Sequence, residues 1–199
     1  MRDLYGFFYL LGNGRPQEAA EEIERAVEQD PLNVLFRTHW AVCLIAAGRK
    51  TEGRAELRQV LELDENFLPA LITIGASHAL RGELAEALAS AEKAYATAPQ
   101  APSVMGLLAG VLALSGDAGR AEAFLEKLRP GRAYGSPRAL GTFHILCGEV
   151  EKAADWAEKV IDQRDPLALL FTCGPLGTAL RSSVRWPGLA KMMNLPEAK

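Results

Sequence analysis

Histidine and cysteine residues stand close together at two places in this chain. His39 precedes Cys43 by four residues, and His144 precedes Cys147 by three. On a helix, either spacing places both side chains on one face, where the pair could supply two metal ligands. A structural zinc site needs about four ligands, and the sequence has no CxxC or HExxH spacing to supply the others. These pairs therefore predict no metal site.

Three other residues could act as nucleophiles. Ser182, Ser183 and Cys173 have no residue beside them in the sequence that could act as a general base. The chain also lacks the GxSxG motif of many hydrolases and a glycine-rich phosphate loop that follows a strand. We therefore expect a protein without enzymatic activity, bound cofactor or metal.

Charge and composition narrow the range of partners. The 199 residues include 22 basic and 25 acidic side chains, which are intermixed and give a net charge of -3. Such a balance provides no broad positive field for nucleic acid. The apolar run within residues 1–14 is too short to span a bilayer and lacks the cleavage site of a signal peptide. The three cysteines are unevenly spaced, as expected of reduced, buried thiols. We expect a soluble chain with no nucleic-acid partner and no membrane segment.

Five glycines recur along the chain at steps of 34, 34, 34 and 32 residues. They are Gly14, Gly48, Gly82, Gly116 and Gly148. Apolar residues at helical spacing accompany these glycines. Because a residue without a Cβ enters the left-handed conformation at little cost, each glycine is predicted to end one helix and reverse the chain into the next. A fixed period near 34 residues is typical of a solenoid of helical hairpins.

Two further positions repeat with each glycine. The residue five positions later is small, as in Ala19, Gly53, Ala87, Ala121 and Ala153, and the residue twelve positions later is apolar, as in Ala26, Val60, Ala94, Leu128 and Val160. We expect the small residue at the crossing of two antiparallel helices and the apolar residue under the next unit. His78 and His144 stand four residues before their glycines, where the other units have leucine. They are predicted to be core histidines with structural partners.

Each unit has a small residue at the crossing and a glycine at the turn, and some units end in a proline, as in Asp30-Pro31 and Ala98-Pro99. This combination resembles the tetratricopeptide repeat. The resemblance implies an all-α protein that forms a right-handed α-solenoid of about five helical hairpins. The expected repeats are residues 1–33, 34–67, 68–101, 102–133 and 134–166. After Pro166 the period is lost, and residues 167–199 are expected to form capping helices over the fifth unit that bury Trp186 and two methionines.

The closing segment carries a second resemblance. Its phrase Leu180-Arg181-Ser182-Ser183-Val184-Arg185-Trp186-Pro187 is similar to the end of tetratricopeptide regions in bacterial multidomain signalling and transcriptional regulator proteins. This likeness implies a regulatory module whose effector domain is not in the sequence. Met1 begins directly inside a repeat, so we expect either a fragment or an assembly surface that includes Leu4, Phe7, Phe8 and Leu11.

In the tetratricopeptide family, the first helix of each repeat lines the concave surface. The resemblance therefore implies that side chains ten, nine and six residues before each turn glycine point into a groove. The candidate partner-binding residues are Leu4, Tyr5, Phe8, Thr38, His39, Val42, Ile72, Thr73, Ala76, Gly106, Leu107, Gly110, Arg138 and Thr142.

Most of these groove positions are apolar or small. Only Arg138 resembles the lysine, asparagine and arginine set with which some family members grip a C-terminal carboxylate. We therefore expect a groove for an apolar or helical segment, with Gly106 and Gly110 permitting close backbone approach. The alternative is that these side chains pack between tightly wound repeats.

Two functions follow from these expectations. The first is a non-catalytic scaffold that presents its concave groove to a peptide or protein partner. The second is a self-associating structural or regulatory domain, whose N-terminal edge or groove packs on its own effector domain or on another copy in a homodimer. We expect a cytoplasmic location, or a periplasmic one if the chain is part of a membrane-anchored regulator.

Overall fold

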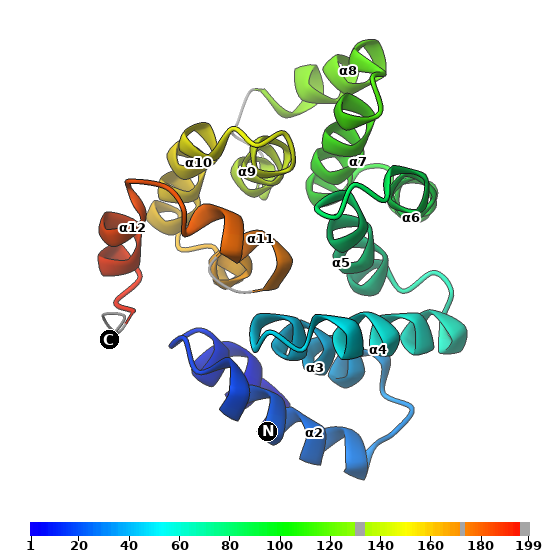
Figure 1. Cartoon of the computed structure of the whole chain (residues 1–199), viewed down its shortest axis with the longest axis vertical. Helices are drawn as coiled ribbons and strands as arrows, with labels where there is room; N and C mark the ends of the chain where they lie inside the picture. The colour runs from blue at the N-terminus through cyan, green and yellow to red at the C-terminus, as the bar shows by residue number, and fades with distance from the viewer. Residues whose placement is uncertain (130–133, 172–173, 196–199) are drawn as a thin grey trace.

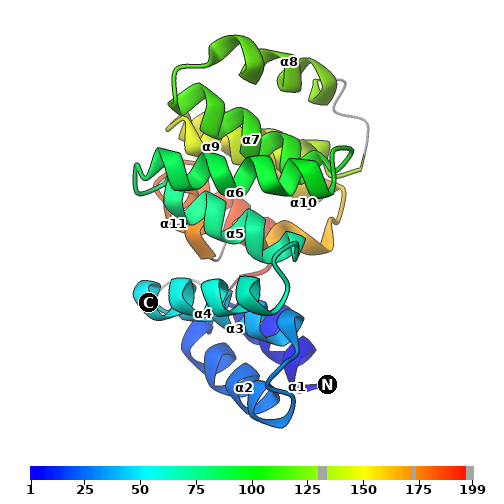
Figure 2. The same cartoon turned by 90° about the vertical axis from the view of Figure 1, so that its right-hand side faces the viewer.

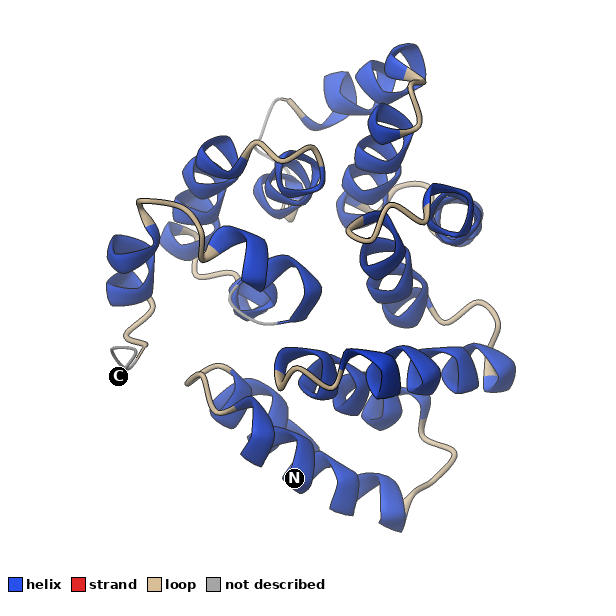
Figure 3. Cartoon of the chain, in the orientation of Figure 1, coloured by secondary structure: helices blue, strands red, loops and turns tan. Residues whose placement is uncertain are grey.

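The computed structural model describes residues 1–129, 134–171 and 174–195. Within these ranges the chain forms helices and loops and no strand (Figure 3). The helices are α1 (Arg2–Leu4), the π-helix η1 (Tyr5–Leu11), α2 (Pro16–Gln29), α3 (Val34–Ala46), α4 (Lys50–Leu63), α5 (Leu68–Ala79), α6 (Leu84–Thr97), α7 (Pro102–Leu114), α8 (Ala118–Leu128), α9 (Ser136–Leu146), α10 (Val150–Asp162), the 3-10 helix η2 (Pro166–Phe171), α11 (Gly174–Leu180) and α12 (Trp186–Met192).

Each of the five periodic glycines lies in the turn of a helical hairpin, as predicted. Their φ angles are all positive, from 71° at Gly14 to 87° at Gly48. At the second turn, the backbone N–H of Gly48 donates to Ile45 O and that of Arg49 donates to Leu44 O, which satisfies carbonyls at the end of α3. A Cβ added at any of these five glycines would meet nothing within 4 Å. Backbone conformation therefore selects glycine at the turns, and lack of space does not.

Small residues at the helix crossings are buried, as the sequence predicts. Ala19, Ala87 and Ala153 are fully buried, and Ala121 nearly so. At the crossing in the second hairpin, a Cβ on Gly53 would lie 2.6 Å from the carbonyl oxygen of Ala41. A larger side chain at this position would force α3 and α4 apart.

Successive hairpins share buried side chains, so the core runs continuously along the molecule. One cluster combines Ile45 of α3, Leu57 of α4 and Ile74 of α5. The next joins Leu71 of α5 to Val104 of α7. The hairpins follow one another along a curved path in an α-solenoid, with α6 and α8 on its outer side (Figures 1 and 2).

The C-terminal segment does more than cover the last hairpin. Helix α12 packs against α10, where Leu189 is buried and Trp186 and Met193 are partly buried, but Met192 is exposed. Helix α11 instead lies inside the curve and contacts α3, α5 and α9 (Figure 1). In η2, Leu170 packs against the core of the first hairpins. The segment thus connects the end of the solenoid with its beginning.

Candidate functional site

The structure divides the fourteen groove candidates by exposure. Leu4, Tyr5 and Phe8 are 58%, 46% and 41% exposed. All the others are buried or half-buried: Thr38, His39, Val42, Ile72, Thr73, Ala76, Gly106, Leu107, Gly110, Arg138 and Thr142. A binding role for any of them stays a prediction, but the exposed surface available to a partner lies mainly at the N-terminal end.

Helix α9 makes the close approach at the two groove glycines. A Cβ on Gly106 would lie 2.3 Å from the carbonyl oxygen of Ala139. A Cβ on Gly110 would lie 2.7 Å from Cδ1 of Leu146. An added methyl at Gly106 would require the backbone to move, whereas at Gly110 the side chain of Leu146 would have to shift. These glycines therefore allow α7 and α9 to pack closely. This arrangement agrees with the alternative interpretation, in which the candidate groove residues pack between tightly wound repeats.

Helix α11 covers another part of the inner face. Gly174 at its start has a φ of 68°, and a Cβ added there would lie 3.5 Å from Cγ1 of Val42. Leu176 of the same helix packs against the buried cluster that contains Ala76 and Leu107. Helix α11 therefore lies beside one groove candidate, Val42, and packs against the cluster that contains two others.

His39 has a carboxylate partner that the sequence reasoning missed. Its Nδ1 lies 2.8 Å from Oδ1 of Asp3, a residue only 2% exposed, and its ring stacks on Phe7 with centroids 3.8 Å apart. These contacts attach α1 and η1 to α3. Asp3 is a single carboxylate beside an N-terminal apolar run, and a buried charge needs a partner. This was the sequence signal from which the pairing could have been found.

Arg138 is also occupied within the chain. Its Nε lies 3.6 Å from Oδ2 of Asp165, and both side chains are largely buried. Asp165 further accepts hydrogen bonds from the backbone N–H of Leu167 and the hydroxyl of Tyr134. The arginine thus helps to attach the C-terminal segment to α9 and does not face an open groove.

The other two histidines form structural contacts. His78 Nδ1 lies 2.6 Å from Glu83 Oε2, and His144 Nδ1 lies 2.6 Å from Glu149 Oε2. Each glutamate directly follows a turn glycine, so both histidines have the structural partners that the sequence predicts, although they are half-buried and not in the fully buried core. Within the described ranges, no three His, Cys, Asp or Glu side chains are grouped to hold a metal ion.

The two described cysteines lack the surroundings of a reactive thiol. Cys43 is buried, and burial raises the pKa of the Cys147 thiol, with a further contribution from the charge of Glu149. A nucleophilic cysteine normally needs the opposite shift. Cys173, the other candidate, lies outside the described residues. Ser183 donates its hydroxyl to Oε2 of Glu151, a contact that fixes the loop before α12.

The exposed apolar candidates lie on η1 and at Leu4, the last residue of α1, whereas Phe7 and Leu11, which the sequence placed on the same surface, are buried in the core. Tyr5 stacks on Tyr9 with ring centroids 5.2 Å apart and an interplanar angle of 16°, and Tyr9 is itself 53% exposed. Together with Leu4 and Phe8, they form a surface that we name the N-terminal aromatic surface. Contiguous exposed apolar side chains of this kind mark interaction sites in soluble proteins.

No helix in the described part of the chain combines the length and apolarity needed to cross a membrane.

Comparison with known structures supports the fold. The chain is similar to a thermophilic TPR protein from Thermus thermophilus, with a TM-score of 0.58 and 20% identity, over 84% of this chain and 91% of that one. It is also similar to a tetratricopeptide repeat protein from Parabacteroides merdae, with a TM-score of 0.56 and 13% identity, over 96% of this chain and 72% of that one.

Sequence models of the tetratricopeptide repeat match residues 10–72 and, in a second model, residues 69–93 and 102–127. The matched segments together include more than half of the 199 residues. Proteins built from this repeat generally bind other proteins and act as non-catalytic scaffolds. The periodic turn glycines, the stacked hairpins and these matches show that the chain belongs to the tetratricopeptide-repeat family.

Proposed function

We propose that this chain is a non-catalytic scaffold that binds a protein partner through the N-terminal aromatic surface. The observation that carries the proposal is the exposure of Leu4, Tyr5 and Phe8, at positions that line the groove in the repeat family. The other eleven groove candidates are buried or half-buried by the chain itself. Tyr5, Phe8 and Tyr9 of this surface lie on a π-helix, a conformation found frequently at functional sites.

The resemblance of the closing segment suggests where such a scaffold acts. We propose that it serves as a regulatory module of a bacterial signalling protein, with its partner or effector domain seated on the N-terminal surface. The covered inner face supports this placement, because α11 already contacts α3, α5 and α9 there. A partner that used the central groove would first have to displace α11.

The test compares two glutamate substitutions on exposed apolar side chains. Phe8→Glu changes the N-terminal aromatic surface, and Val184→Glu changes an 84% exposed residue near the opposite end of the chain. Binding partners captured by the folded wild-type chain should be lost with Phe8→Glu and retained with Val184→Glu. Equal capture by both variants, with unchanged melting curves, would refute the proposed surface.

Self-association is the second candidate function, and the same exposed aromatic residues favour it. An apolar surface on one copy can pair with the same surface on another in a twofold dimer. Sedimentation equilibrium should then report a dimer for the wild type and a monomer for Phe8→Glu. A wild-type monomer at high concentration, unaffected by Phe8→Glu, would exclude this candidate and leave the scaffold with a different partner.

A further inference from the structure

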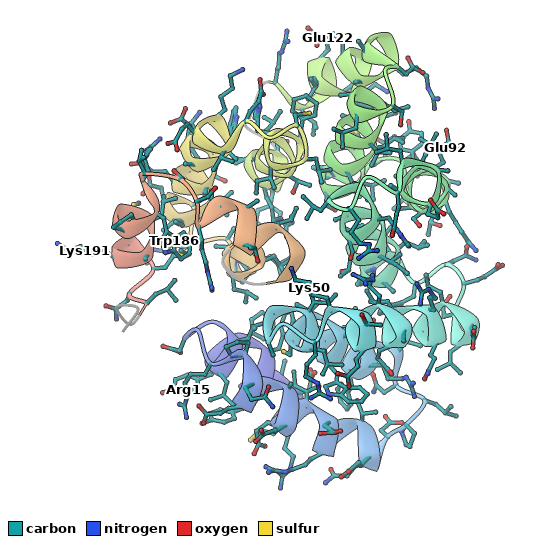
Figure 4. The ribbon with its side chains drawn as sticks, in the orientation of Figure 1. Arg15, Lys50, Glu92, Glu122, Trp186 and Lys191 are labelled. Carbon is teal, nitrogen blue, oxygen red and sulfur yellow. The ribbon has the colours of Figure 1, made fainter. Side chains whose placement is uncertain are left out.

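A cleft of about 260 Å³ lies between the start of α4, the end of α5 and α11. Its polar lining consists of the cations Lys50, Arg54 and Arg81 and the hydroxyl residues Ser77 and Thr178. Figure 4 shows Lys50 at the start of α4, in the region between that helix and α11. Since one water molecule takes about 30 Å³ in the liquid, the cleft has room for an anion of several atoms.

The positive charge in this cleft is only partly neutralised. Arg81 donates from Nε to Oε1 of Glu83 at 2.7 Å. Lys50 and Arg54 form no ion pair with any residue that the structure describes. None of the described lining residues is a carboxylate. Because cations gathered in a cleft focus a positive potential there, the site favours a negatively charged ligand.

Ser77 lines the cleft and is 6% exposed. It adds a hydroxyl that makes no hydrogen bond to a described residue of the protein. By contrast, the hydroxyls of Thr38 and Thr73 donate to the carbonyl oxygens four residues earlier. The Ser77 oxygen is not among the described buried atoms that lack a partner, so it keeps contact with solvent and can donate its hydrogen to a ligand in the cleft.

We propose that this cleft is a binding site for a small phosphate monoester. The donors are two guanidinium groups, an ammonium and two hydroxyls, more than the two oxygens of a single carboxylate can use. A phosphoryl group offers three terminal oxygens and close to two negative charges above its second pKa of about 6. Ile45 and Leu80, also in the lining, provide apolar contacts for the organic part of the ester.

The site has a consequence for α11. Its lining comes from α4, α5 and α11, so a bound ester would contact three elements that are distant in the sequence. A ligand that binds only this arrangement stabilises it by mass action. The proposal uses none of the residues of the N-terminal aromatic surface and is therefore independent of the proposed scaffold function.

Isothermal titration calorimetry at pH 8 and constant ionic strength tests the proposal with phenyl phosphate, inorganic phosphate and benzoate. Phenyl phosphate should bind one to one and at least tenfold more tightly than benzoate, which carries a carboxylate on the same ring. Inorganic phosphate should compete with phenyl phosphate. Lys50→Met and Arg54→Met should each weaken binding about tenfold, since each removes a charged hydrogen-bond donor.

The matched control is Arg58→Met, which removes an exposed cation one turn further along α4 and outside the cleft lining. It should leave the affinity for phenyl phosphate unchanged. Melting curves without ligand should be the same for all three variants, because these side chains make no described ion pair. Equal loss of binding in Arg58→Met and Arg54→Met would overturn the proposal, as would benzoate binding as tightly as phenyl phosphate.

Discussion

Single residues decide how closely the helices approach one another. Gly106 and Gly119 are both helical glycines, but their surroundings differ. A Cβ on Gly106 would come within 2.3 Å of a backbone oxygen of α9, whereas a Cβ on Gly119 would meet nothing within 4 Å. The same substitution therefore has opposite expected effects at the two positions.

We predict that Gly106→Ala destabilises the protein by about 1–3 kcal/mol, because the added methyl forces α7 and α9 apart. Gly119→Ala should stabilise it by up to about 1 kcal/mol, since alanine restricts the unfolded chain and favours the helix. Urea denaturation of the two variants beside the wild type measures both effects. A neutral result for Gly106→Ala would contradict the close packing of α7 and α9.

A second prediction concerns Glu83. Hydrogen bonding from His78 first, and from Arg81 next, holds the pKa of the Glu83 carboxyl below its usual range. The unfolded chain has the ordinary glutamate pKa of about 4.3. The stabilising effect is thus present above this pH and is lost as the pH falls through the lower value of the folded state.

The expected result is that Glu83→Gln shows a smaller fall in urea midpoint than the wild type when the pH drops from about 5 to about 3. At neutral pH this variant should be the less stable of the two. Glu86→Gln is the control, because Glu86 is exposed three residues later, in the first turn of α6, and makes no ion pair with a described residue. If the urea midpoint of Glu83→Gln fell as much as that of the wild type over this pH range, the hydrogen bonds to Glu83 would contribute nothing to stability.

At the scale of the helices, the crossing of α5 and α6 tests the repeat register. Ala87 is fully buried, whereas Ala85 on the same helix is exposed. Ala87→Phe should cost about 1–3 kcal/mol through overpacking, and Ala85→Phe should change stability by less than about 0.5 kcal/mol. Thermal or urea unfolding measures the difference. Similar values for the two variants would place the crossing elsewhere.

The helical hairpins were predictable because their determinants are local and repeated. The turn at Gly48 needs a positive φ, and the crossing at Gly53 needs the absence of a side chain, so the residue type reveals each role. The position of α11 was not predictable in this way. Its seven residues have no period, and its place against α3, α5 and α9 depends on contacts far apart in the sequence.

The same limit applies to the candidate site. The sequence identified first-helix positions through the family geometry, but it could not show that α11 lies beside Val42 or that Asp3 pairs with His39. The phosphate-ester cleft is also formed by three separate elements. Lys50 and Arg54 alone, four residues apart, look like the solvated face of a helix. Only the fold brings Arg81 and Ser77 beside them.

For the whole molecule, the C-terminal segment changes how the hairpins are coupled. In an open solenoid each repeat contacts only its neighbours, so weakening one interface uncouples the two sides. Here Ile74 lies in the cluster that joins the second and third hairpins. The C-terminal segment provides a second connection, because Leu170 packs on the first hairpins and α11 contacts α3, α5 and α9.

This second connection predicts how the chain unfolds. Trp40 in α3 and Trp156 in α10 report on opposite ends, and each can be followed alone after Trp→Phe changes at the other tryptophans. Ile74→Ala should cost about 2–5 kcal/mol and lower both fluorescence midpoints together, since the C-terminal connection remains. Ile74→Ala combined with Leu170→Asp weakens both connections and should separate the two midpoints. If Ile74→Ala alone separated them, the C-terminal segment would contribute no coupling, and the molecule would behave as an open row of repeats.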